Sequence, residues 1–318
     1  MIIEMLHTVS IVIPVLFSIF GTSLGQARIG EHTIEAIDSQ PEAYAALRKA
    51  SIIGLAITET AGILGLVVSI LFLLNPATEV NMFYASFGRM GIAIGLGISG
   101  MMAGIMAAKP VIAACISTAR QPFFNGKIIN IMFITQTLIM TPNIFGFLIA
   151  LLIRSRLSTV DSLVEGLQLL AAGIAVGIGS IGPSIGLSTF AYAACIAVGK
   201  NKKVYSKILS LTFVTEAMIE TPAIFSLLIS LSIINLPISS ETDILRGIAC
   251  LAAGTCMGVS SIAAGISSGK IGAAACAKIA EIPEMSQQVS KLNILALALV
   301  DSFPIYGLII AITLLYVT

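Results

Sequence analysis

Charged residues are scarce in this chain. They make up 10% of its 318 residues, against 57% hydrophobic residues, and the mean hydropathy is +1.02. Because so few charges cannot give a water-soluble domain a polar exterior, the composition predicts a multi-pass membrane protein. The formal net charge is +1, and this balance gives no reason to expect a nucleic-acid partner.

The motifs of soluble catalysis are also missing. The sequence contains no P-loop, no nucleophile triad and no pair of catalytic carboxylates, so we expect neither a catalytic site nor a cofactor. All five cysteines lie inside apolar runs without metal-ligand spacing, and Cys115, Cys195 and Cys276 each follow two alanines. We interpret them as small helix-packing residues rather than disulfide partners.

A fourfold repeat is the main feature that is present. Glu59 lies in the apolar run 52–65, and the pattern returns at Met140, Glu220 and Asp301, at spacings of 81, 80 and 81 residues. A hydroxyl residue follows each position, and the second copy lacks the ionisable group. We divide the chain into four units: 1–78, 79–158, 159–240 and 241–318.

Each unit contains two apolar segments around a short polar loop. Every segment can cross about 30 Å of hydrocarbon at a rise of about 1.5 Å per residue. Backbone groups in lipid must bond within their own segment, which makes the segments helices. The predicted fold is therefore an all-α membrane protein with eight transmembrane helices in four tandem hairpins, over residues 5–27, 50–74, 86–116, 128–153, 166–198, 208–236, 246–279 and 292–317.

The first helix of a unit is rich in small residues, as in Gly91-x3-Gly95-x-Gly97-x2-Gly100-x3-Gly104. Small residues let helix backbones approach closely in lipid. The second helices carry bulkier Leu, Ile and Phe residues. A narrow helix paired with a wide one forms a wedge, and wedges can close into a ring with the narrow helices inside. A compact eight-helix bundle is the alternative.

Positive charges indicate the orientation. Most Lys and Arg residues lie in the loops within units, whereas the opposite face carries only Arg89, Arg154, Arg156 and Arg246. The positive-inside rule places the loops within units in the cytoplasm and both termini on the other side. The charges of these loops are Arg48, Lys49, Arg120, Lys127, Lys200, Lys202, Lys203, Lys207, Lys278 and Lys291.

At the loops the chain resembles a known family. Gln40-Pro41 in the first loop and Arg120-Gln121-Pro122 in the second are similar to the R-Q-P loop of the c-subunit, the proteolipid of F-type and V-type rotary ATPases. The Gly-rich first helix and the carboxylate in the second helix match as well, so the resemblance covers four fused c-type hairpins. It implies a rotor ring of several copies in membrane lipid, with the a-subunit of the stator and central-stalk subunits as partners. The stalk would contact these loop residues.

The third and fourth loops depart from the motif, as does Met140. The third loop reads Gly199-Lys200-Asn201-Lys202, and the fourth reads Ala280-Glu281-Ile282-Pro283. These changes put stalk contacts by units three and four in doubt.

An ionisable group in hydrocarbon costs about 2.5–3.5 kcal/mol even on lenient insertion scales, so such groups commonly serve an ion or proton path. The resemblance implies that Glu59, Glu220 and Asp301 carry Na⁺ or H⁺. In sodium-coupled members a first-helix Gln or Glu joins the carboxylate, while a neighbouring hairpin supplies a hydroxyl and a backbone carbonyl. Gln26, Thr60 and the Ile57 carbonyl match those positions, and this oxygen set favours Na⁺ over H⁺.

The second unit keeps a hydroxyl at Thr141 although Met140 cannot hold an ion. Sites in such a ring are shared between neighbouring hairpins, so Thr141 and the Leu138 carbonyl could complete a site whose carboxylate belongs to a neighbouring hairpin. The alternative is a threonine bonded to its own helix. Gln136, one turn earlier, is either a further ligand or a helix–helix hydrogen bond.

Units three and four differ in their oxygen groups. Glu216 and Glu220 lie one turn apart on one helix face. Two such carboxylates in low dielectric cannot both stay ionised without a cation, so they share a proton or hold an ion. Glu216 is the weaker candidate ligand, because it could instead face a stator or lipid headgroups. The remaining candidate oxygens are Thr221 in the third unit, and Ser302 and first-helix Ser268 beside Asp301.

Two other functional classes fit parts of the pattern. One is a secondary transporter or channel of four repeats, and the other is a membrane pore or scaffold without ion turnover. Transporter repeats usually contain broken helices along a pathway, whereas glycine here follows a packing period. Three carboxylates in four hairpins would move about a quarter fewer ions per turn than one ion per hairpin. Fewer ions per turn supply less free energy from the gradient for each ATP made. This favours pumping driven by ATP, or synthesis under a steep gradient.

Overall fold

The computed structural model describes residues 2–74, 81–237 and 244–317. Eight helical rods in these ranges are long and apolar enough to cross a membrane, which agrees with the prediction of four hairpins. Three of the rods divide into two α-helices each. The α-helices are α1 (Ile2–Ser39), α2 (Tyr44–Leu74), α3 (Met82–Met106), α4 (Ala108–Arg120), α5 (Asn125–Ile139), α6 (Thr141–Arg156), α7 (Leu163–Gly179), α8 (Ile181–Lys200), α9 (Tyr205–Asn235), α10 (Ile244–Glu281) and α11 (Ser286–Val317).

Five short 3₁₀ helices complete the helical part of the described chain. Four of them form the turn inside a hairpin, and one follows α6. Three of the four turn helices begin with proline, whose fixed φ suits the first position of a helix. They are η1 (Pro41–Ala43), η2 (Pro122–Phe124), η3 (Leu157–Thr159), η4 (Lys202–Val204) and η5 (Pro283–Met285).

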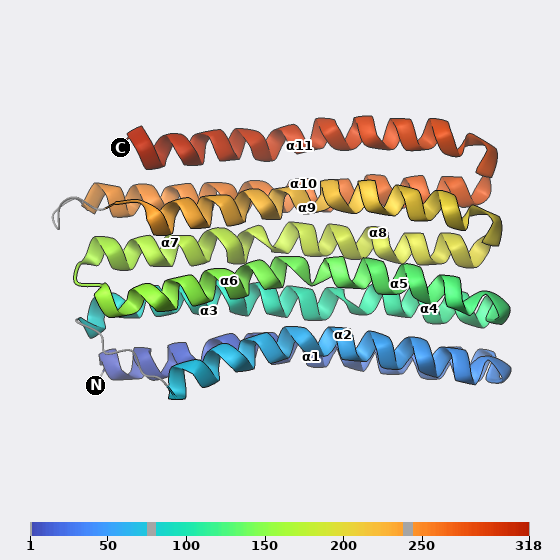
Figure 1. Ribbon diagram of the computed structural model, residues 1–318, viewed down its shortest axis with the longest axis horizontal. Coiled ribbons are helices and arrows are strands. Elements are labelled where there is room, and N and C mark those ends of the chain that lie inside the picture. The colour runs from blue at the N-terminus through green and yellow to red at the C-terminus, as the bar shows by residue number, and fades with distance from the viewer. Residues whose placement is uncertain (1, 75–80, 238–243, 318) are drawn as a thin grey trace.

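The hairpins stand side by side in a row of two layers (Figure 1). In one layer α1 packs against α3, α3 against α7, and α7 and α8 against α10. In the other, α2 contacts α5 and α6, and α9 contacts both α6 and α11. The first and fourth hairpins lie at opposite ends of the row, and both termini lie at the end away from the hairpin turns (Figure 1).

Glycine allows the close packing of the first layer. A Cβ added at Gly173 would collide with the Gly91 backbone, and one added at Gly186 would collide with the Gly265 carbonyl. The same holds for a Cβ at Gly25 against the backbone of the third rod. Backbones this close require the absence of a side chain, as expected for packing in lipid. The first helices therefore form the tight layer that the sequence predicts.

The helices are longer than the apolar segments that predict them. The first segment is expected to end at residue 27, but α1 continues to Ser39, because a helix needs apolar residues only within the hydrocarbon. Three rods are interrupted, at Ala107, Met140 and Ser180. Proline follows each interruption by two or three residues, and a proline removes the hydrogen bond to the carbonyl four residues earlier.

Three other prolines do not interrupt their helices. Pro14, Pro222 and Pro304 lie inside α1, α9 and α11, which continue through them. The proposed unit boundary at 158/159 falls in η3. The boundaries at 78/79 and 240/241 lie outside the described residues.

Candidate ion-binding site

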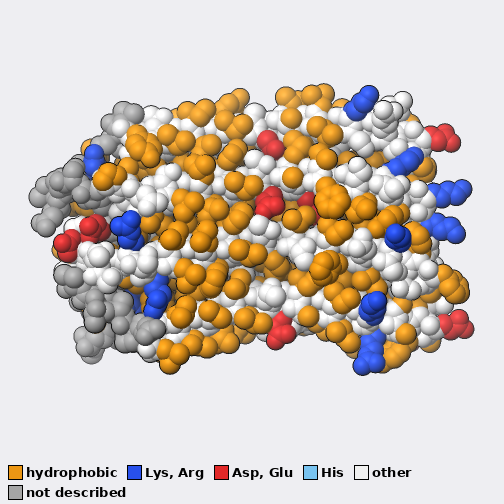
Figure 2. Space-filling model, in the orientation of Figure 1, with side chains coloured by type: hydrophobic (Ala, Val, Ile, Leu, Met, Phe, Trp, Pro, Cys, Tyr) orange, Lys and Arg blue, Asp and Glu red, His pale blue; other side chains and the backbone are white. Residues whose placement is uncertain are grey.

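Acidic side chains lie midway along the rods, surrounded by apolar surface (Figure 2). Among the second-helix residues of the repeat, Glu59 is exposed on α2, Glu220 is half-buried on α9, and Asp301 is half-buried on α11. Met140, at the matching position between α5 and α6, is 6% exposed. The equal spacing of the repeat therefore places three carboxylates at similar positions along their rods.

One carboxylate is shared between two hairpins. The Thr141 side chain, in the second hairpin, lies close enough to Glu220 in the third for its hydroxyl to interact with that carboxylate. Pro142 has no N–H group, so the Leu138 carbonyl lacks its usual helical donor four residues later. The structure thus brings Thr141 close to the carboxylate of a neighbouring hairpin.

The oxygen groups of the first hairpin lie near Glu59 without bonding to it in the described structure. The Gln26 amide donates to the Leu55 carbonyl at 3.4 Å, one turn before Glu59. The Thr60 hydroxyl donates to the Ile57 carbonyl at 2.7 Å. If Thr60 serves the next hairpin as Thr141 does, it faces Met140 rather than Glu59.

Gln136 forms a helix–helix hydrogen bond. Its amide nitrogen lies 2.8 Å from the Gly54 carbonyl oxygen and 3.1 Å from the Thr58 hydroxyl, both on α2. Its own oxygen is buried without a hydrogen-bond partner among the described residues. Gln136 thus ties the second hairpin to the first one turn from Met140, in agreement with the second of the two interpretations from the sequence.

Glu216 occupies the same repeat position in the third hairpin and is fully buried. Neither of its carboxylate oxygens has a hydrogen-bond partner among the described residues. Its charge interacts with Glu220 on the same helix, and with Cys195 on α8 and Cys276 on α10. Glu216 therefore faces neither the lipid nor an exposed surface of this chain.

The fourth hairpin has a sparser arrangement. The Ser302 hydroxyl donates to the Leu299 carbonyl at 2.7 Å, and one oxygen of Asp301 has no hydrogen-bond partner in the part of the chain that the structure describes. Ser268 on α10 is buried, and its hydroxyl is likewise unpartnered there. Thr221 donates to the Ala217 carbonyl at 3.0 Å. Within the described ranges, no hydrogen bond is recorded that joins Ser268 or Thr221 to Asp301.

The hairpin turns are linked by side chains that bridge to the next turn. Gln121 donates to the Gly199 carbonyl at 2.7 Å, and Asn201 donates to the Ala280 carbonyl at 3.3 Å. Asn201 is not among the residues predicted from the sequence, although it stands 80 residues after Gln121 and follows the same repeat. Gln40, in the first turn, has no recorded side-chain hydrogen bond within the described residues.

The turn of the second hairpin exposes a large aromatic side chain beside a surface pocket. The Phe123 side chain is fully exposed, next to a surface pocket lined by Arg120, Gln121 and Pro122 and by the lysines of η4. Lys and Arg side chains gather at this end of the molecule (Figure 2). The predicted stalk-contact residues of the second loop are thus accessible from water.

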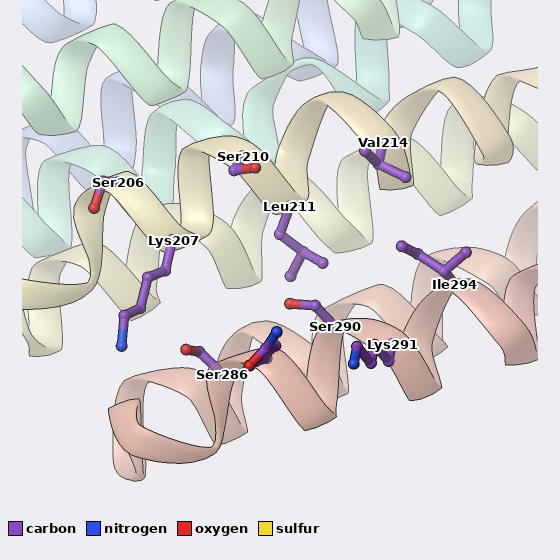
Figure 3. A pocket seen from close by; sticks show the side chains of 10 residues that line it. Ser206, Lys207, Ser210, Leu211, Val214, Ser286, Ser290, Lys291 and Ile294 are labelled. Carbon is purple, nitrogen blue, oxygen red and sulfur yellow. The ribbon is translucent and has the colours of Figure 1, made fainter.

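A separate groove opens between α9 and α11 near the turns (Figure 3). Ser210 and Lys207 approach it from α9, and Ser290 and Lys291 from α11. Lys207 donates to the Pro283 carbonyl at 2.7 Å. The groove has no carboxylate in its lining, so we assign it no part in ion binding. Within the described residues, no cluster of His, Cys, Asp and Glu is suited to a metal ion.

Comparison with known proteins identifies the family. The family of ATP synthase C-subunits matches the chain four times, once per hairpin, over residues 9–72, 90–153, 170–233 and 251–314. The chain belongs to this family. Each matched region contains one of the four repeat positions described above.

Similar proteins match either about a fifth of this chain or most of it. The ATP synthase c-subunit of Chloroflexus aurantiacus is 37% identical over 67 residues, which cover 21% of this chain and 88% of the relative. The c-subunit of Dehalococcoides mccartyi is 40% identical over 68 residues, or 21% and 90% of the two chains. The K-subunit of the A-type ATP synthase of Methanocaldococcus jannaschii is 28% identical over 228 residues, or 72% and 95%. Eight apolar helices and this membership establish an integral, multi-pass protein of the c-subunit family.

Proposed function

We propose that this chain forms a rotor ring with further copies of itself and carries Na⁺ across the membrane on Glu59, Glu220 and Asp301. The alternative cation is H⁺. The observation that supports the proposal best is the approach of Thr141 to Glu220, because it brings a hydroxyl of one hairpin to the membrane-embedded carboxylate of the adjacent one. Family membership favours a rotor over a four-repeat transporter, channel or scaffold.

The repeat extends this arrangement to the other interfaces between hairpins. Thr221 and the Met218 carbonyl would serve Asp301, as Thr141 and the Leu138 carbonyl would serve Glu220. Thr60 and the Ile57 carbonyl would face Met140 and hold no ion. Glu59 lies at the end of the row, so Ser302 of a neighbouring copy would complete its site.

Na⁺ is favoured by the kind of oxygen atoms available. In the proposed arrangement a hydroxyl and a carbonyl would accompany each carboxylate, and hard oxygen ligands of this kind suit an alkali cation. Prolines at 142 and 222 leave the carbonyls of Leu138 and Met218 without their usual donors. Gln26 adds an amide one turn from Glu59.

The chain itself would be a translocating subunit with no catalytic site. As the ring turns, each carboxylate would exchange its cation at the a-subunit of the stator and carry it through the lipid in neutral form, because a bare charge there is costly. The loops within hairpins would face the cytoplasm, with both termini on the opposite side. These loops would meet the central stalk through Gln40, Pro41, Arg120, Gln121 and Pro122.

Carbodiimide labelling of the purified complex tests this function. The reagent modifies a protonated carboxyl group, so a bound Na⁺ should block it. We expect millimolar Na⁺ to protect Glu59, Glu220 and Asp301, measured residue by residue by mass spectrometry. Labelling that depends on pH alone would identify H⁺ as the cation, and no labelling of any of the three would reject the ion-carrying assignment.

A further inference from the structure

Helix packing does not explain why residue 216 is a glutamate. In the second hairpin the same repeat position is Gln136, which donates to the Gly54 carbonyl and the Thr58 hydroxyl. In the first and fourth hairpins it is Leu55 and Leu297. The other three hairpins therefore fill this position with an amide or an apolar side chain. Packing alone does not require a carboxylate there.

The surroundings of Glu216 offer no compensation for a negative charge. It is fully buried and both of its oxygens lack hydrogen-bond partners in the described structure. The titratable groups that interact with it are Glu220 on α9, Cys195 on α8 and Cys276 on α10. None of these side chains is cationic, and an unpaired buried carboxylate is strongly unfavourable.

The position of Glu216 points to the cation of the neighbouring carboxylate. Residues four apart on a helix lie on one face, one turn from each other, so Glu216 stands one turn from Glu220 and deeper in the protein. Glu220 is half-buried and already meets the Thr141 hydroxyl. A cation held at Glu220 is therefore within the electrostatic reach of a second carboxylate.

We propose that Glu216 and Glu220 form one two-carboxylate cation site, which is neutral when it holds one Na⁺ and one proton, and which holds its Na⁺ more tightly than the single carboxylates Glu59 and Asp301 do. This inference rests on the proposed function and specifies it further: the three ion sites of one chain are unequal. A rotating ring would then meet one site in each chain that releases its cation less readily than the others.

Matched variants at position 216 test this pairing in the assembled complex. Glu216→Gln gives the third hairpin the residue of the second, and Glu216→Leu gives it the residue of the first and fourth. Glu216→Asp keeps a carboxylate. The measurement is the Na⁺ concentration that half-protects each carboxylate from carbodiimide at fixed pH. Glu59 and Asp301 in the same sample serve as internal controls for folding and assembly.

We expect half-protection of wild-type Glu220 at a Na⁺ concentration about tenfold lower than that of Asp301, because the second carboxyl group supplies a further oxygen ligand to the cation. Glu216→Gln and Glu216→Leu should remove this difference without moving the value at Asp301. Glu216→Asp should retain most of it. An unchanged half-protection concentration at Glu220 in the Gln and Leu variants would overturn the pairing.

Failure of sodium transport gives a different result. If Na⁺ protects none of the three carboxylates, sodium binding is rejected whatever residue stands at 216. The pairing is then tested with H⁺ as the cation, through the pH midpoint of labelling at Glu220. A midpoint that differs between wild type and Glu216→Gln supports the pairing, and an identical midpoint rejects it.

Discussion

Thr141 shows, at the scale of single residues, how a hairpin without a carboxylate can retain a function. Its neighbour Met140 is buried and carries no charge, yet the Thr141 hydroxyl meets Glu220 of the next hairpin. A hydroxyl kept beside a lost carboxylate has a purpose in ion binding only if sites are shared. Thr60 and Thr141 then occupy equal repeat positions but differ in what they face. Thr141 would serve the Glu220 carboxylate, whereas Thr60 would face Met140, which holds no ion.

Substitution at these two positions should separate them. Thr141→Val removes a hydroxyl ligand while keeping a similar shape, and it should raise the Na⁺ concentration that half-protects Glu220 about tenfold, since hydrogen bonds to charged groups contribute about 1.5–3 kcal/mol. Thr60→Val is the matched control and should leave all three carboxylates unchanged. A shift at Glu59 in the control would show that Thr60 serves its own hairpin instead.

The contacts between whole helices depend on glycine in one layer and on polar side chains between hairpins in the other. Gly173 and Gly91 allow α7 and α3 to touch backbone to backbone, whereas Gln136 joins α5 to α2 through hydrogen bonds. The two layers are thus held together by different means, and each can be weakened separately.

Gly173→Ala should disrupt the first layer. Its Cβ would collide with the Gly91 backbone, which has no flexible side chain to move aside. We expect a lower yield of assembled ring on native gels and a lower melting temperature in detergent. Gly30→Ala is the matched control, because nothing lies within 4 Å of a Cβ added there. Equal assembly of the two variants would argue against close backbone packing.

Gln136→Leu should weaken the contact between the first two hairpins without changing ion binding. Polar contacts between membrane helices contribute about 0.6 kcal/mol on average and at most about 1.7 kcal/mol. A lowered melting temperature with normal Na⁺ protection of Glu220 and Asp301 is the expected result. Loss of protection at those sites would instead mean that Gln136 takes part in ion binding.

Much of the element-scale structure can be predicted from the sequence. Repeat spacing and apolar length predict four hairpins, because lipid permits few alternatives to a helix. Helix ends are predicted poorly, as at Ser39, since polar residues outside the hydrocarbon still form helix. The interruptions at Ala107 and Ser180 are not predicted, although Pro110 and Pro183 stand shortly after them.

The candidate site is predictable in position and less so in its contacts. The repeat gives the three carboxylates equal places in their hairpins and indicates that Thr141 serves a neighbouring hairpin. It does not decide what Gln136 contacts, since an amide can bond to a helix or to an ion. It also does not say which carboxylate Thr60 serves, because a match to the family's hydroxyl position leaves open which neighbour that residue faces.

The whole molecule is an open row rather than a closed ring. The first and fourth hairpins lie at its two ends (Figure 1), so a ring requires further copies to join those ends. Glu59 then depends on a neighbour that this chain alone does not contain.

Ser302→Ala tests that dependence between copies. In a ring of identical chains, Ser302 should face Glu59 of the next copy, so its loss should weaken Na⁺ protection of Glu59 about tenfold. Protection of Asp301, the adjacent residue in the same chain, should change less. The opposite ranking of the two effects would reverse the proposed direction of sharing.

Met140 sets the transport stoichiometry of the proposed rotor. With three carboxylates in four hairpins, each chain should move three cations per turn, which leaves less gradient energy for each ATP made and suits pumping driven by ATP.

The most direct measurement is the number of cations moved per ATP by the purified complex in vesicles. The number of chains per ring and the number of ATP molecules used per turn are determined independently, which converts the ratio into cations per chain for each turn. Three cations per chain for each full turn is the expected result. Four per chain, one for every hairpin, would contradict the proposed function of the three carboxylates, as would ATP hydrolysis by a coupled complex that moves none.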